Sequence, residues 1–80
     1  MHETHILKNI LRYLDEEENK SHRKIKKIEL SLSEFSGFSE EHLRQHLKEE
    51  TSGTNRENLK VEIKKIAFGP ELKITKVYYS

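Results

Sequence analysis

The residues best suited to chemistry are the first three, Met1, His2 and Glu3. We expect Met1 to carry a free α-amine. That amine, the His2 amide nitrogen and the His2 imidazole can then close adjacent chelate rings on one metal ion. This set of nitrogen donors suits a divalent metal ion with square-planar coordination. The Glu3 amide, the Glu3 carboxylate or the His5 imidazole would supply the fourth donor. The sequence therefore predicts a metal site at Met1, His2 and Glu3, with His5 as a further candidate.

Length and composition limit the kind of scaffold that can hold the first three residues in place. Eighty residues predict a single domain over 1–80. Hydrophobic residues make up 32% and charged residues 36%, so the core is small and a homodimer or another partner would add apolar contact. The net charge of +1 gives no bulk attraction for nucleic acid or acidic membranes. The absence of cysteine excludes disulfides, thiolate zinc sites and cysteine nucleophiles.

Targeting and membrane segments are not evident in the sequence. No apolar run approaches the roughly 20 residues needed to span a bilayer. Lys8 and Arg12 interrupt the first apolar stretch, which does not resemble a signal peptide. We therefore expect a cytoplasmic protein that does not act on membranes.

Two helices are predicted from apolar spacing. The first covers residues 4 to about 20, because apolar residues recur there at the spacing of one buried stripe. Ser39 has the character of an N-cap for a second helix that ends near Glu50, with Leu43 and Leu47 inward and Gly53 as a left-handed cap. The stripe of the first helix comprises Ile6, Leu7, Ile10, Leu11 and Leu14.

Three strands are predicted from alternating apolar and polar residues, over 28–33, 59–64 and 72–77. A turn at 67–70 predicts that the second and third strands form an antiparallel hairpin. The order is then α-β-α-β-β. This order predicts an α+β fold of two layers, with two helices packed on one face of a three-stranded sheet.

Four landmarks along the chain resemble the HypA/HybF family of nickel-incorporation proteins, which assist maturation of nickel–iron hydrogenases and sometimes urease. They are Met-His-Glu at 1–3, Ser-Glu-Phe-Ser-Gly at 33–37, Glu-His-Leu-Arg at 41–44 with Thr-Ser-Gly-Thr at 51–54, and Gly-Pro-Glu-Leu at 69–72. The resemblance implies that the metal ion at the amino terminus is nickel(II) and that His2 is one of its ligands. It also implies a HypB-type GTPase and a hydrogenase precursor as partners, for which the exposed faces of the first helix are our expected docking site.

One feature of the family, its zinc ribbon, is missing from this sequence. Its members carry a zinc ribbon with two Cys-x-x-Cys pairs between the last two long strands. Here only Ala67 and Phe68 separate Ile66 from Gly69, so we expect no zinc. The resemblance therefore implies a nickel metallochaperone reduced to its nickel-binding domain. The alternative is an interaction module of the same fold that has lost metal delivery.

Other candidate sites have weaker support. His42 and His46 are four residues apart, a spacing that can bind a metal but that also fits half-exposed side chains beside the core. Lysines on the predicted strands would form a basic face for RNA, but no aromatic residues alternate with them, so nucleic-acid binding is the weakest alternative. No phosphate loop or nucleophile motif is present, so we do not expect an enzyme. Tyr78 and Tyr79 are expected to be packing or interface residues rather than to take part in chemistry.

Overall fold

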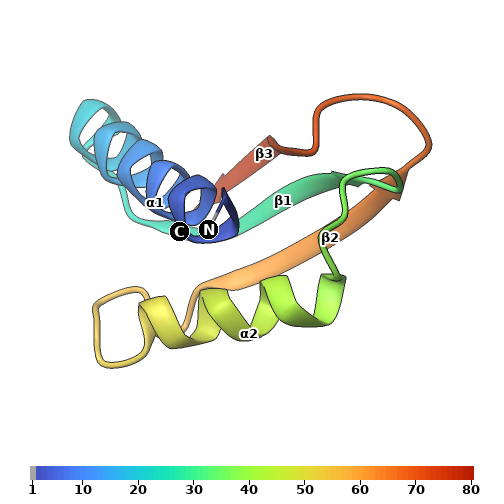
Figure 1. Cartoon of the computed structure of the whole chain (residues 1–80). Coiled ribbons are helices and arrows are strands. Elements are labelled where there is room, and N and C mark those ends of the chain that lie inside the picture. The colour runs from blue at the N-terminus through green and yellow to red at the C-terminus, as the bar shows by residue number, and fades with distance from the viewer. Residues whose placement is uncertain (1) are drawn as a thin grey trace.

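The computed structural model describes the backbone of residues 2–80 and the side chains of residues 5–80. Two helices and three strands follow one another in the predicted order (Figure 1). The predicted α+β class is confirmed. The elements are α1 (His2–Ser21), β1 (Ile25–Ser33), α2 (Glu40–Thr51), β2 (Lys60–Ile66) and β3 (Leu72–Tyr79).

The strand order is β2-β1-β3, with β1 in the centre. β1 pairs with β2 in parallel and with β3 antiparallel. The predicted hairpin between the second and third strands is therefore wrong. Residues 67–71 do not make a tight turn between neighbours. They carry the chain past the end of β1, from one edge of the sheet to the other (Figure 1).

Apolar content explains why β1 is central. Ile28, Leu30 and Leu32 of β1 are at most 1% exposed, whereas the apolar residues of β2 and β3 are only partly buried. The connection between β1 and β2 contains α2, as a parallel crossover requires. This crossover leaves the other edge of β1 free for β3. β1 also begins at Ile25 rather than at the predicted Ile28, because Ile25 pairs with Tyr79.

The core lies between the helices and one face of the sheet (Figure 1). From α1 it takes three of the five residues in the predicted stripe, and Ile6 and Leu11 pack at its border. Both predicted inward residues of α2, Leu43 and Leu47, are buried. The fully or nearly buried apolar residues of the core are Leu7, Ile10, Leu14, Ile25, Ile28, Leu30, Leu32, Leu43 and Leu47.

Both ends of α2 follow the sequence prediction. The Ser39 hydroxyl accepts a hydrogen bond from the His42 backbone N–H at 3.4 Å. At the other end the backbone N–H of Ser52 donates to the Lys48 carbonyl, and Gly53 adopts a left-handed φ of 78°. The local sequence therefore sets both ends of this helix.

Replacing Ser39 by alanine should lower the free energy of unfolding by about 0.5–1 kcal/mol, because one N–H of the first turn loses its acceptor. Urea denaturation would measure this loss. The control is Ser52→Ala, which retains the backbone bond to Lys48 and should change stability by less than about 0.5 kcal/mol. Equal losses in both variants would contradict the capping role.

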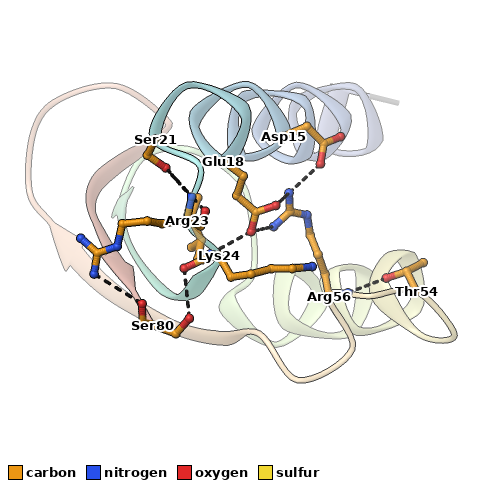
Figure 2. Close-up of polar contacts among 9 residues, drawn as sticks. Asp15, Glu18, Ser21, Arg23, Lys24, Thr54, Arg56 and Ser80 are labelled. Atoms are coloured by element: carbon orange, nitrogen blue, oxygen red, sulfur yellow. Dashed lines mark hydrogen bonds and ion pairs between the residues drawn. The ribbon is translucent and has the colours of Figure 1, made fainter.

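A nearly buried arginine joins the second half of the fold to α1. The Arg56 side chain, 8% exposed, lies in the α2–β2 connection and reaches Asp15 at 2.5 Å and Glu18 at 3.1 Å (Figure 2). Glu18 also accepts a hydrogen bond from the Ile25 N–H at 2.8 Å. One carboxylate therefore ties α1 both to the start of β1 and to the loop before β2.

Candidate metal centre

The predicted nickel tip coincides with the first turn of α1. The helix begins at His2, two residues earlier than the sequence predicts. The first N–H groups of any helix have no intrahelical acceptor. The amides of His2 and Glu3 therefore belong to the turn whose N–H groups are free of helical hydrogen bonds. The predicted ligand Met1 and the side chains of His2 and Glu3 lie outside the described residues.

His5 is the one predicted ligand whose side chain is described. It is exposed, and positions 2 and 5 are one turn apart on the same side of α1. His5 also lines a shallow cleft of about 340 Å³, together with Ile6, Ser36, Phe38 and Glu71. The cleft connects the first turn of α1 with the β1–α2 loop and the residue before β3.

Glu71 is a neighbour of His5 that could not be expected from the sequence. It lies 66 positions from His5 in the sequence, yet the two residues line the same cleft. The only available signal was its place in the Gly-Pro-Glu-Leu landmark at 69–72, which says nothing about its neighbours in space. Among the residues whose side chains are described, no group of three or more His, Cys, Asp or Glu could hold a metal ion.

The second candidate pair, His42 and His46, is arranged as stacked rings. Their centroids are 6.4 Å apart and their planes differ by 16°. His42 is exposed and His46 half-buried beside the core residue Leu47. This arrangement matches the interpretation of half-exposed side chains flanking the core.

The uncovered face of the sheet carries the predicted lysines, and it also carries an aromatic residue that the sequence analysis did not place there. The Tyr78 ring lies 5.0 Å from the Nζ atoms of both Lys27 and Lys76. Two of the lysines are paired with carboxylates of the same face, Lys27 with Glu62 at 3.3 Å and Lys64 with Glu29 at 3.4 Å. Part of the positive charge on this face is therefore balanced locally.

Comparison with known protein families identifies the family of this chain. The family described as hydrogenase/urease nickel incorporation, metallochaperone, HypA, matches residues 1–75. The chain belongs to the HypA family. No curated protein matches it. HypA proteins are metallochaperones that serve nickel incorporation, so this chain has a role in the maturation of hydrogenase or urease.

The HypA match includes the tip, the cleft and the connection at 67–71. It covers 1–3, where the predicted nickel ligands lie, and the Gly-Pro-Glu-Leu landmark that contains Glu71. In the part of the chain that the structure describes, no helix has the length and apolar composition needed to cross a membrane.

Proposed function

We propose that this HypA-family chain holds one nickel(II) ion at its amino terminus and delivers it to a hydrogenase precursor in the cytosol, with a HypB-type GTPase as its partner. The ligands would be the Met1 amine, the His2 amide and imidazole, and a donor from Glu3 or His5. Nickel is the cargo of this protein, and we expect neither catalysis nor a zinc ion. The start of α1 at His2 is the observation that best supports the proposal.

The electrostatics of a helix start decide what kind of complex can form there. The helix dipole disfavours a bare cation at this end by roughly 0.3–1 kcal/mol at exposed positions. Deprotonated amide ligands remove this objection, since each lowers the positive charge of the complex by one. The amides of His2 and Glu3 can lose their protons without breaking a helical hydrogen bond. The same geometry that repels a hydrated cation therefore suits an amide-bound nickel ion.

A nickel titration tests the proposal. The wild-type protein with an unextended Met1 should bind one equivalent and develop the yellow absorption of square-planar nickel(II). The His2→Ala variant, and a protein with residues added before Met1, should bind at least tenfold more weakly. Wild-type affinity should fall as the pH is lowered, because protons compete for the nitrogen donors.

The control variant is His42→Ala, which removes a histidine of the stacked pair on α2 and should leave nickel affinity unchanged. Equal binding by the wild-type, His2→Ala and extended proteins would reject the amino-terminal site. The protein would then be better described by the alternative, an interaction module of HypA fold that has lost metal delivery.

A further inference from the structure

We propose that two exposed phenylalanines beside the amino-terminal tip form a docking surface for a protein that presents an apolar pocket rimmed by lysine or arginine. We call this surface the aromatic tip, and it consists of Phe35 and Phe68 with the neighbouring carboxylates Glu34 and Glu71. The inference extends the proposed function, on which it rests, by naming the surface and the chemistry through which a partner is bound.

The two rings of the aromatic tip are far more exposed than apolar residues of this size usually are. Phe35 is 77% exposed and Phe68 is 82% exposed. Their centroids are 6.1 Å apart with the rings inclined by 28°, so they form one continuous apolar surface. Neither ring belongs to the core or packs at its border. Contiguous exposed apolar surface rimmed by polar residues is characteristic of protein interaction sites.

Backbone hydrogen bonds hold the two loops of the aromatic tip side by side. The Glu34 N–H donates to the Ile66 carbonyl at 2.9 Å, and the Ser33 N–H donates to the Glu71 carbonyl at 3.1 Å. Within the β1–α2 loop, the Phe35 N–H donates to the Ser33 hydroxyl at 3.2 Å. Aromatic side chains on a rigid base lose little conformational entropy on binding, which makes them effective anchors.

The charge around the aromatic tip indicates the chemistry of the partner. Segments 33–42 and 66–72 together contain four glutamates and no lysine or arginine, although the whole chain has a net charge of +1. Lys65 lines a cleft with Glu34, and Arg44 and Lys65 line another with Glu40 and Glu41, so the glutamates still outnumber the nearby basic residues. Arg44 pairs with Glu40 at 3.2 Å, and the other three, Glu34, Glu41 and Glu71, are exposed. A basic rim around an apolar pocket would complement this end of the molecule.

A single cleft links the aromatic tip to the first turn of α1. Ser36, the neighbour of Phe35, lines the cleft that His5 also lines, and so does Glu71 of the tip itself. A partner seated on the two rings would therefore contact the end of α1 at which we propose that nickel is held. Docking and metal transfer would then use one continuous surface.

The test compares binding to two probes, the HypB-type GTPase and the hydrogenase precursor encoded by the same genome. We expect at least one to bind the wild-type chain, and the double variant Phe35→Ser with Phe68→Ser to bind it at least tenfold more weakly. The double variant Glu34→Lys with Glu71→Lys should also bind more weakly, with a shallower dependence on salt. Calorimetry gives the affinities, and circular dichroism checks that each variant is folded.

Tyr13→Ser removes an exposed aromatic ring from α1, the docking site expected from the sequence, and so compares that helix with the aromatic tip. Glu49→Lys reverses an exposed charge on α2 and is the matched control for charge. Both should bind as the wild type does. The inference is overturned if neither probe binds the wild type, if the phenylalanine variant binds normally, if Tyr13→Ser loses as much affinity, or if the lysine variant binds more tightly.

Nickel binding by the same proteins separates this inference from the proposed function. The phenylalanine variant should bind nickel with wild-type affinity, because neither ring is among the proposed ligands. Failure of the wild type to bind nickel would reject the proposed function and leave a measured docking surface intact. Normal nickel binding with partner binding that does not depend on the two rings would reject only the docking surface.

Discussion

Replacing Arg56 by alanine should lower the free energy of unfolding by about 2–3 kcal/mol. The guanidinium is nearly buried and bonds to both Asp15 and Glu18, and hydrogen bonds to charged groups each contribute about 1.5–3 kcal/mol. Asp15 is 68% exposed, so solvent screens its share, while Glu18 at 17% exposed would be left without its charged partner. Urea denaturation of the two proteins measures the difference.

The control for Arg56 is Arg12→Ala. Arg12 is exposed, and its guanidinium donates to Asn9 on the same helix at 3.1 Å, so its loss should change stability by less than about 0.5 kcal/mol. A cycle that combines Arg56→Ala with Glu18→Gln should show coupling, because the two side chains share hydrogen bonds. Additive effects in that cycle would mean that the bonds between Arg56 and Glu18 do not contribute to stability.

Replacing Leu30 by alanine should have the largest effect on stability, a loss of about 3–4 kcal/mol. Leu30 is 0% exposed in the central strand, where it is paired with Ile63 on one side and Ile74 on the other. A cavity there borders all three strands. A domain of this length is stabilised by about 4–12 kcal/mol in total, so the variant should unfold at much lower denaturant concentration or temperature.

Leu72→Ala is the matched control for Leu30, since it removes the same atoms from a partly buried position at the start of β3. Its loss should be about half that of Leu30→Ala or less, because part of the leucine side chain is already in contact with water. Equal losses would show that the core does not centre on β1.

Spacing along the chain was sufficient to predict the elements, because helix and strand periodicity and the caps of α2 are local properties. Ser39 and Gly53 illustrate this, since each acts within a few residues of its own position. Strand pairing is not local, and the hairpin prediction failed there. A signal was present in the predicted strands, however: 59–64 and 72–77 each contain two lysines and 28–33 contains none, and lysines are typical of strands at sheet edges. The observed β1 starts three residues earlier and includes Lys26 and Lys27, so the signal is confined to its second part.

The site was only partly predictable for a related reason. The chelating pattern of Met1 and His2 depends on adjacent residues and can be recognised in the sequence. The cleft between His5 and Glu71, and the contact between Phe35 and Phe68, join residues from separate elements. Arg56 was missed because Asp15 and Glu18, three residues apart on α1, have the pattern of a solvated helix face.

The connection at 67–71, which joins the outer strands β2 and β3, is well placed to accept an inserted domain. Its two ends, Ile66 and Glu71, are each clamped by a main-chain bond to the end of the central strand, through Glu34 and Ser33 respectively. An insertion between them leaves both ladders untouched and adds only the slowly rising entropy of a longer loop. We therefore expect a domain inserted at this connection to leave the rest of the fold intact.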